Sequence, residues 1–445
     1  MRTIDLRGHR LTTAELLAAV PRAADARATA ITTAHDIVED VRTRGEESLR
    51  EQAARFDGVT GHEVRVPKHH IDEAVAGLDP VVRQALDEAI RRVRIASQAQ
   101  VPAPSTTELA PGARVTQRWQ PVSRVGVYVP GGKAVYPSSV VMNVVPAQVA
   151  GVRSVALASP AQSHNGGRVH PTILAAAGLL GVDEVYAMGG AGAIGALAHG
   201  VASLRLEPVD VVSGPGNNFV AAAKRAVAGI VGVDSEAGAT EILIVADDTA
   251  DPRIVAADLV SQAEHDEQAS AVLVTTSPEL ADRVTDEVAL AAASTRHSER
   301  VEAALAGPQS AIVLVDDLGA AAAFSNAYAP EHLELHIADA ASAASEYVNA
   351  GAIFVGPDSP VSLGDYLAGS NHVLPTGGQA RYASGLGAFT FLRPQQIIEY
   401  DHDALRQVSG GIVALAEAEA LPAHGEAVTT RFPGSRAERR TAPSR

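Results

Sequence analysis

The sequence predicts an α/β fold of two Rossmann-like parallel-sheet domains, one inserted in the other, with small helical pieces at the N- and C-terminal ends. Three observations support this prediction. Short apolar segments alternate with helical segments from residue 125 to 234, the alternation starts again near residue 236, and glycine-rich turns follow several of the apolar segments. Alternating strands and helices of this length form parallel sheets with both faces covered. A chain of 445 residues also exceeds what one ordinary core accommodates.

The expected domain boundaries follow the changes in pattern. They give an N-terminal helical segment (1–25), a first α/β domain (26–120 and 236–385), a second α/β domain (121–235), a C-terminal helical tail (386–433) and a disordered, arginine-rich tail (434–445). The second domain therefore interrupts the first in sequence. Chain ends that are not tied down are commonly disordered.

The composition excludes several classes of protein. The net charge of −16 argues against nucleic-acid binding, which needs a basic face. No apolar run reaches the ~20 residues of a membrane span, and the first residues lack the apolar core of a signal peptide, so we expect a cytoplasmic protein without a membrane partner. The absence of cysteine excludes disulfides, iron–sulfur ligation, thiolate zinc sites and a cysteine nucleophile. A bound metal would take His, carboxylate or amide ligands.

The first elements are helices without evident chemistry. Helices are expected at about 14–17, 34–56 and 79–98. Thr12 or Thr13 can cap the first helix, and Asp57-Gly58 ends the second. We expect these helices to serve packing.

The inserted domain alternates strands and helices in a regular order. Strands are expected at 125–129, 154–158, 184–188 and 209–213, and helices at 138–149, 171–180, 193–199 and 219–228. Glycine-rich turns at 130–133, 189–195 and 214–217 follow three of these strands. Glycine lets backbone amides approach a phosphate, and the next helix presents its positive end. Because ligands of such sheets bind beyond the carboxyl ends of the strands, we expect these turns to face a ligand.

Residues 190–195 have glycine at the first, third and sixth positions, as in the dinucleotide-binding fingerprint. The segment follows a strand and begins a helix. However, the fingerprint normally belongs to the first strand of its unit, and here it follows a later one. From the pattern alone, two interpretations stay open: contact with the pyrophosphate of a cofactor, and close packing of a helix on a strand.

The first α/β domain resumes after residue 236. Its strands are expected at 241–246, 271–274, 311–314 and 352–355, with a further strand that begins at Glu331-His332. Asp251 can cap a helix that has proline at its first position. This helix carries Gln262 and His265, which are three residues apart and project from one side of the same turn. An amide and an imidazole so placed can share a metal, although polar residues at this spacing also form ordinary solvated faces.

Glu331 and His332 are adjacent ionisable side chains of different type. They follow Pro330, which restricts the backbone, and precede residues that alternate apolar and polar like a half-buried strand. Histidine titrates nearest neutrality, and the carboxylate can tune it or take its own proton step. The alternative is a solvated pair on a loop. Glycine and proline then cluster from 356 to 378, in a long loop, ordered or disordered, of the kind that tends to be functional; it contains Asp365.

Six short motifs span most of the chain, in the order in which they occur in one enzyme family. They are Tyr128-Val129-Pro130-Gly131-Gly132, Gly214-Pro215-Gly216-Asn217, Ser261-Gln262-Ala263-Glu264-His265, Pro330-Glu331-His332-Leu333, Gly364-Asp365-Tyr366 and Ser370-Asn371-His372-Val373-Leu374-Pro375-Thr376. On these motifs the chain resembles the histidinol dehydrogenase family. The resemblance implies NAD-dependent oxidation of L-histidinol to L-histidine through L-histidinal, a four-electron reaction with two NAD⁺ that ends histidine biosynthesis. It also implies a homodimer with shared active sites and a zinc ion in each site.

The resemblance implies roles for individual residues, and it assigns the metal and catalytic groups to the first α/β domain and NAD binding to the second. Four residues match the zinc ligands of the family, which also contact the substrate: Gln262, His265, Asp365 and His424. Further substrate contacts of the family correspond to Thr240, His332, His372 and Glu419. The cofactor contacts of the family correspond to Tyr128, Gly192 and Asn217. His332 is implied to remove the alcohol proton and Glu331 to activate water. The 386–433 tail is expected to hold helices and, through His424, to complete the zinc site of the partner subunit.

Two positions depart from the family pattern. Threonine stands at position 240, where serine is common, and keeps the hydroxyl. Glycine stands at position 192, where the family usually has glutamine, so this position lacks the side chain of the cofactor-side hydrogen bond. The apparent fingerprint at 190–195 depends on this departure, and we therefore give it little weight.

Two other functions fit parts of the pattern. A zinc hydrolase could use the same metal with Glu331 as the base for water and His332 as the acid. A non-catalytic α/β binding protein would not need an adjacent acid–base pair. The glycine-rich turns favour a phosphate-bearing cofactor, and hence the dehydrogenase.

Overall fold

The computed structural model describes residues 1–22, 27–131, 134–235 and 238–432. The chain forms two compact units: residues 1–101 with 122–391, and residues 102–121 with 392–445. The predicted disordered tail at 434–445 lies outside the described residues, as does the end of the predicted glycine-rich turn at 130–133.

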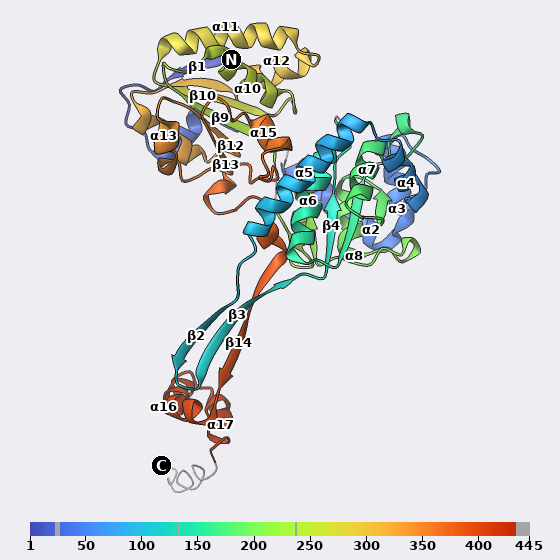
Figure 1. The fold of residues 1–445 in the computed structure, drawn as a ribbon, viewed down its shortest axis with the longest axis vertical. Coiled ribbons are helices and arrows are strands. Elements are labelled where there is room, and N and C mark those ends of the chain that lie inside the picture. The colour runs from blue at the N-terminus through green and yellow to red at the C-terminus, as the bar shows by residue number, and fades with distance from the viewer. Residues whose placement is uncertain (23–26, 132–133, 236–237, 433–445) are drawn as a thin grey trace. The chain divides into compact units, whose positions relative to one another are not determined.

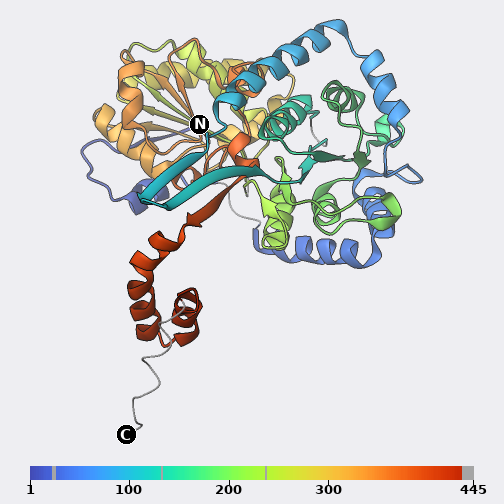
Figure 2. The ribbon, with the colours of Figure 1, turned by 60° about the horizontal axis from the view of Figure 1, so that its bottom comes forward.

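A six-stranded parallel sheet forms one centre of the first unit (Figure 1). Its strand order is β1 (Arg2–Asp5), β11 (Ala311–Leu314), β10 (Ser270–Thr275), β9 (Glu241–Ala246), β12 (His332–His336) and β13 (Ala352–Val355). Helices α10 (Pro252–Ala263), α11 (Pro278–Ser294) and α12 (Ser298–Ala306) share one apolar cluster with the sheet, and α1 (Thr13–Ala19) and α13 (Leu318–Tyr328) share the other. Figure 2 shows helices on both sides of these strands. Both faces are covered, so β9 and β10 are buried along their whole length.

A five-stranded parallel sheet forms the other centre of this unit. Its strand order is β6 (Val185–Ala187), β5 (Ser154–Ser159), β4 (Arg124–Tyr128), β7 (Val211–Ser213) and β8 (Gly232–Val233). Helices α6 (Pro137–Ala150), α7 (Pro171–Leu179), α8 (Gly190–His199) and α9 (Asn218–Val227) alternate with these strands. All five strands lie between β1 and β9 in sequence, so this domain is inserted in the first. The predicted α/β fold with two parallel sheets is confirmed.

The helices between residues 27 and 99 pack differently from expectation. They are α2 (Arg27–Arg44), α3 (Glu46–Gln52), a π-helical turn (Ala53–Asp57), α4 (Lys68–Ala76) and α5 (Pro80–Ala99). The sequence division placed them with the six-stranded sheet, but α2 contacts α8 and α9, α4 contacts α7, and α5 contacts α6. An amphipathic pattern shows that a helix buries a face, but not which sheet receives it. The helix expected over 34–56 is interrupted at Gly45, whose φ of 58° no ordinary helix contains.

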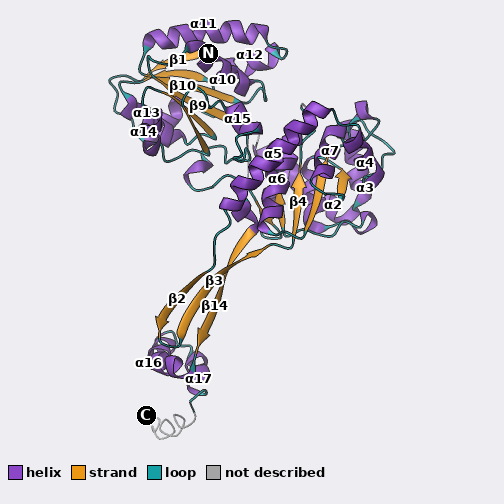
Figure 3. Cartoon of the chain, in the orientation of Figure 1, coloured by secondary structure: helices purple, strands orange, loops and turns teal. Residues whose placement is uncertain are grey.

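The 386–433 tail was expected to be helical, but it begins with a strand, and residues 102–121, which were expected to belong to the first α/β domain, form strands in the same unit. Strands β2 (Ser105–Ala110), β3 (Ala113–Pro121) and β14 (Leu392–Tyr400) form an antiparallel sheet in the order β14-β3-β2. Helices α16 (His402–Ala418) and α17 (Pro422–Thr429) follow β14, as Figure 3 shows. The sequence did not predict these strands, because most of their residues are exposed and lack an apolar pattern. In addition, β14 pairs with β3, which lies far from it in the sequence.

The remaining elements are short. They are α14 (Ala340–Ala343), α15 (Val361–Tyr366) and 3₁₀ turns at Ser163–Asn165, Ala202–Leu204, Ala344–Glu346, Gln379–Arg381 and Ala388–Phe391. The loop expected over 356–378 is thus ordered and contains α15. Among the helices that the structure describes, none combines the length and apolar character needed to cross a membrane.

Candidate active site

The predicted acid–base pair lies at the amino end of the six-stranded sheet. Glu331 directly precedes β12, and His332 is the first residue of that strand. A sharp turn brings the chain there from α13, because Ala329 ends this helix with φ at 51°, an uncommon conformation for a residue with a side chain. Both side chains are buried, with 6% and 4% of each residue exposed. The solvated loop pair considered above is therefore wrong.

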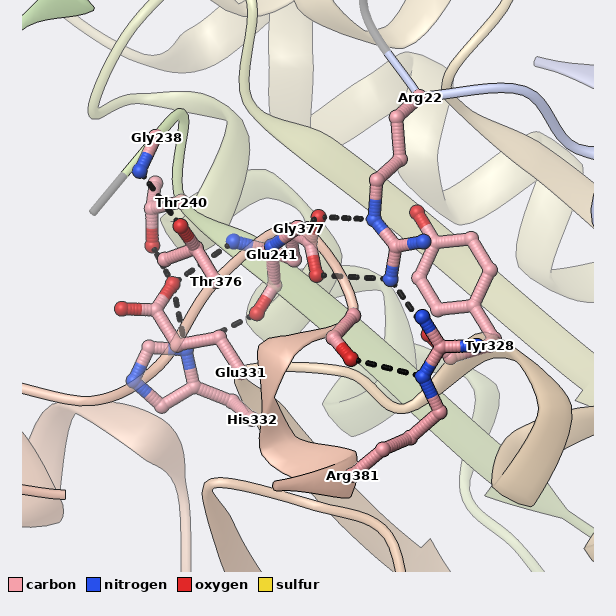
Figure 4. Close-up of polar contacts among 11 residues, drawn as sticks. Arg22, Gly238, Thr240, Glu241, Tyr328, Glu331, His332, Thr376, Gly377 and Arg381 are labelled. Atoms are coloured by element: carbon pink, nitrogen blue, oxygen red, sulfur yellow. Dashed lines mark hydrogen bonds and ion pairs between the residues drawn. The ribbon is translucent and has the colours of Figure 1, made fainter. Parts of the chain in front are cut away.

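The backbone of Glu241 holds both members of the pair (Figure 4). Its N–H donates to Glu331 Oε2 at 2.9 Å, and its carbonyl oxygen lies 2.9 Å from His332 Nδ1. A carbonyl only accepts hydrogen bonds, so Nδ1 carries the proton and Nε2 of the neutral ring is free to accept one. The Thr240 hydroxyl also donates to Glu331 Oε2, at 2.5 Å.

Burial governs the ionisation of this pair. It raises the pKa of Glu331 to about 7, although His332, the Thr240 hydroxyl and the Glu241 amide all favour the carboxylate. A carboxyl group with a pKa near neutrality can accept and return a proton under physiological conditions.

The side chain of Glu241 is fixed by a partly buried ion pair that the sequence did not suggest. Arg22 Nε donates to Glu241 Oε1 at 2.5 Å, and the Gly377 amide donates to the same oxygen at 3.2 Å. The Arg22 guanidinium also lies 4.1 Å from the centre of the Tyr328 ring, within the range of a cation–π contact. Arg22 and Glu241 are 219 positions apart, so no local pattern could pair them.

Gln262, in the last turn of α10, presents an acceptor suited to a cation. Its Nε2 donates to the Thr240 hydroxyl at 2.6 Å. Its Oε1 is buried and finds no hydrogen-bond partner among the described residues. An orphaned buried amide oxygen fits a metal ligand, since a cation would replace the missing donor.

His265 and Asp365 supply the chemistry of two further predicted ligands. Burial lowers the pKa of His265, which favours the neutral ring that metals bind, while the charge of Asp365 acts in the opposite direction. Asp365 lies in α15, inside the predicted long loop. Amide, imidazole and carboxylate donors together suit zinc in a chain without thiolates. The residues present therefore fit the metal that the resemblance implies.

His372, predicted to contact the substrate, has both ring nitrogens engaged. Nδ1 lies 2.9 Å from the backbone oxygen of Asp365, and Nε2 lies 3.2 Å from the hydroxyl of Ser139 on α6. Burial lowers its pKa. The side chain thus links α15 to a helix of the inserted domain, and sequence reasoning did not find Ser139.

A second buried cluster lies further along β12. Because side chains of a strand alternate, Glu334 and His336 point to the same face as His332. His336 Nε2 is 3.2 Å from Glu334 Oε2 and 3.8 Å from Asp258 Oδ2. All three groups offer ligand atoms within 4.8 Å of one another, so they could hold a metal. Burial and the charge of Glu334 raise the pKa of Asp258 to about 7, so Asp258 can hold a proton near neutral pH.

The predicted cofactor residues lie at the carboxyl edge of the five-stranded sheet. Tyr128 ends β4, is buried, and accepts a hydrogen bond from the Gly190 amide at 3.2 Å. Gly192 lies in the first turn of α8. Asn217 caps α9, with its Oδ1 accepting from the amides of residues 219 and 220, which leaves its NH₂ group for another partner.

Gly214, in the turn after β7, has a conformation that only glycine accommodates. Its φ is 119°, and an added Cβ would lie 1.9 Å from the carbonyl oxygen of Tyr128. The side chain of Asp234 accepts from its amide at 2.9 Å, and Lys224 donates to its carbonyl oxygen. Lys224 and Asp234 form a buried ion pair at 2.5 Å. Hydrogen bonds to both the amide and the carbonyl oxygen of Gly214 therefore hold the turn in place.

The last two predicted site residues belong to the second unit. Glu419 follows α16, and His424 lies in the first turn of α17; both are exposed. Their roles stay predictions from the resemblance.

The chain is similar to known proteins in both sequence and fold. The family profile described as histidinol dehydrogenase matches residues 20–432. A histidinol dehydrogenase of Leifsonia xyli subsp. xyli is 67% identical over 432 residues, covering 97% of this chain and 99% of the relative. One of Thermobifida fusca is 59% identical and covers 97% of both chains. The crystal structure of histidinol dehydrogenase from Elizabethkingia anophelis superposes with a TM-score of 0.89 at 32% identity, covering 97% of this chain and 98% of that one.

Together with the two parallel sheets and the buried acid–base pair, these matches define an oxidoreductase of the dehydrogenase class. More particularly, the chain belongs to the histidinol dehydrogenase family. The six motifs in the sequence had predicted this membership.

Proposed function

We propose that the protein oxidises L-histidinol to L-histidine through L-histidinal, with two NAD⁺, in the last steps of histidine biosynthesis. The observation that carries the proposal is the buried Glu331–His332 pair, which one backbone unit orients and which the Thr240 hydroxyl links to the amide of Gln262, whose oxygen has no partner among the described residues. The family matches support histidinol as the substrate. The cytoplasmic location stays the expectation stated from the sequence.

His332 acts as a base in both halves of the reaction, whereas Glu331 acts only in the second half. In the first, His332 Nε2 takes the proton of the alcohol while the hydride on the same carbon passes to NAD⁺, which leaves the aldehyde. In the second, Glu331 takes a proton from water as it adds to the aldehyde, and His332 takes the remaining hydroxyl proton of the hydrate while its hydride passes to a second NAD⁺, which leaves the carboxylate. A thiohemiacetal route is closed, because the chain has no cysteine.

The site needs two bound groups. Gln262, His265, Asp365 and the partner subunit's His424 would hold zinc, which when bound would anchor the imidazole and amine of the substrate. Thr240, His372 and Glu419 would contact the substrate. The turns carrying Tyr128, Gly192 and Asn217 would receive NAD⁺, since they lie where parallel sheets bind dinucleotides.

Spectroscopy tests the activity. Purified protein with zinc, NAD⁺ and L-histidinol should form NADH, seen as near-ultraviolet absorbance, with two NADH for each histidine. A chelator should abolish the signal and zinc should restore it, with metal affinity falling as the pH drops through the histidine range. A zinc hydrolase would cleave a substrate without forming NADH, and a binding protein would turn nothing over. Metal-loaded, folded protein that forms no NADH contradicts the proposal.

Complementation tests the shared site. The variants Asp365→Ala and His424→Ala should each be nearly inactive. With random co-expression about half of the dimers are mixed, and each has one intact site if His424 serves the partner, so about a quarter of wild-type activity should return. If differently tagged mixed dimers are isolated and show no activity, His424 serves its own chain.

A further inference from the structure

We infer that Gln52, on α3, is a cofactor-contact residue, and that its side-chain amide fills the place left open by Gly192 and accepts a hydrogen bond from a ribose hydroxyl of NAD⁺. The inference rests on the proposed function for the identity of the cofactor. It names a residue that none of the six motifs contains.

The first observation is the position of the Gln52 amide. A Cβ built on Gly192 would lie 2.0 Å from Gln52 Oε1, 2.8 Å from Cδ and 3.1 Å from Nε2. Real Cβ atoms do not approach other heavy atoms so closely, so a side chain at position 192 and Gln52 in its present rotamer exclude each other. The glycine at position 192 is thus matched to the glutamine at position 52.

The second observation is that the amide is oriented. Gln52 Nε2 donates to the Ser48 hydroxyl at 2.9 Å, and this hydroxyl donates to Asp40 Oδ2 at 2.6 Å. These hydrogen bonds hold the amide nitrogen of Gln52 toward α2 and α3. The oxygen therefore faces the first turn of α8, and Gln52 keeps part of its surface accessible to a ligand.

The third observation is the backbone around this side chain. Gln52 ends α3, and a π-helical turn, Ala53–Asp57, follows directly. Such turns are rare and frequently occur at functional sites. Asp57 in this turn is close enough to Tyr128 for its charge to raise the pKa of the tyrosine hydroxyl, which itself contacts the Gly190 amide. Four polar groups from α3, the π-helical turn, β4 and α8 therefore gather at the carboxyl edge of the sheet.

The chemistry of the Gln52 amide oxygen determines which part of the cofactor it can contact. An amide oxygen accepts hydrogen bonds, and a cofactor phosphate at neutral pH has no proton to donate. A ribose hydroxyl does, and in dinucleotide sites a side-chain carboxylate accepts a hydrogen bond from a ribose hydroxyl, as an amide oxygen also can. The pyrophosphate would instead take the backbone amides of the α8 turn.

Binding of NAD⁺ to the zinc-loaded enzyme, measured by calorimetry, tests this inference. Gln52→Ala should weaken binding by roughly three- to tenfold, the loss of one hydrogen bond. The KM for histidinol should stay within about twofold, and the melting temperature should not change. Glu51→Ala, in the same turn but directed to Arg44, is the matched control and should leave NAD⁺ binding unchanged.

Position 192 provides a second variant. Gly192→Gln should weaken NAD⁺ binding, because its side chain meets Gln52, and adding Gln52→Ala should restore affinity toward the wild-type value. Unchanged NAD⁺ affinity in Gln52→Ala overturns the inference, and so does an equal rise in the KM for histidinol. If the wild-type enzyme itself fails to bind NAD⁺, the proposed function fails as well, so the two failures are distinguishable.

Discussion

The two parallel sheets of the first unit carry their candidate site residues at opposite edges. In the five-stranded sheet, the turns that carry Gly190 and Gly214 follow strands, at the carboxyl edge where ligands of such sheets usually bind. In the six-stranded sheet, Thr240 and Glu331 precede strands, at the amino edge. The first edge offers backbone amides and the second offers side chains, so the same architecture provides two different kinds of site.

Helix direction explains the division. At the carboxyl edge helices begin, and their free amides and positive ends suit the phosphates of a cofactor. At the amino edge helices end, and α10 brings Gln262 in its last turn with His265 just beyond it. The negative end of a helix suits a cation, whether a metal ion or a protonated imidazole.

The largest effect is expected from Gly214→Ala, which breaks the carboxyl-edge site. The new Cβ would overlap the Tyr128 carbonyl oxygen, in a backbone conformation that disfavours any side chain. We expect the free energy of unfolding to fall by about 4 kcal/mol or more, and NAD⁺ binding to be lost. Gly410→Ala, at a helical position with open space around it, is the control and should not destabilise the protein. Near-normal stability of Gly214→Ala, measured by chemical denaturation, would show that the turn can rearrange.

The next effect is expected from His332→Asn, which breaks the amino-edge site. Losing the base should slow both halves of the reaction by roughly 10²–10⁴. Binding of NAD⁺ should change little, since the residue belongs to the other sheet. Single-turnover rates from histidinol and from histidinal measure the two halves separately. A variant that oxidises the alcohol at the normal rate would remove His332 from its role.

Glu331→Gln sharpens the distinction within the pair. Only the aldehyde half needs water, so this variant should slow oxidation of histidinal more than oxidation of histidinol. The glutamine can still accept from Thr240 and Glu241, which keeps the neighbouring groups in place. Equal slowing of the two half-reactions would contradict the assignment.

The smallest effect concerns stability and pH. In the folded chain the pKa of Glu331 is raised from its ordinary 4.5 to about 7. The folded state thus binds this proton more tightly than the unfolded state, and the resulting stability is present at low pH and is lost as the pH rises from about 4.5 to 7. The difference is at most about 3 kcal/mol. Relative to wild type, Glu331→Gln should therefore gain stability as the pH rises from about 4.5 to 7, and parallel stability–pH curves would show that the pKa is not raised.

Local patterns predicted the parts of the fold that depend on neighbouring residues. The strands expected at 241–246, 311–314 and 352–355 coincide with β9, β11 and β13, because continuous apolar segments identify buried strands. The Asp251 cap before Pro252 is also confirmed. Pairings between distant residues were not predictable: β1 with β11, β14 with β3, and the helices near the N-terminus with the inserted sheet.

The candidate site divides in the same way. The motifs named Glu331, His332 and Gln262, but not the partners that orient them. The Glu241 backbone, the Arg22 ion pair and the Gln52 amide belong to no motif, since each acts through a contact across the fold. These contacts join residues that lie far apart in the sequence, so no local pattern contains them.

The Thr240 hydroxyl fixes the donor and the acceptor of two consecutive hydrogen bonds in the candidate site. Glu331 Oε2 accepts from both Thr240 and the Glu241 amide, so the hydroxyl proton points to the carboxylate. The hydroxyl oxygen then accepts from the NH₂ group of Gln262, which turns the amide so that its oxygen faces away from Thr240. An amide can rotate by half a turn with little change in shape. Here the Thr240 hydroxyl oxygen accepts from the NH₂ group of Gln262, which leaves the amide oxygen for a cation. Glu331, which is proposed to activate water, and Gln262, which is proposed to bind the metal, therefore share one polarised chain of two hydrogen bonds.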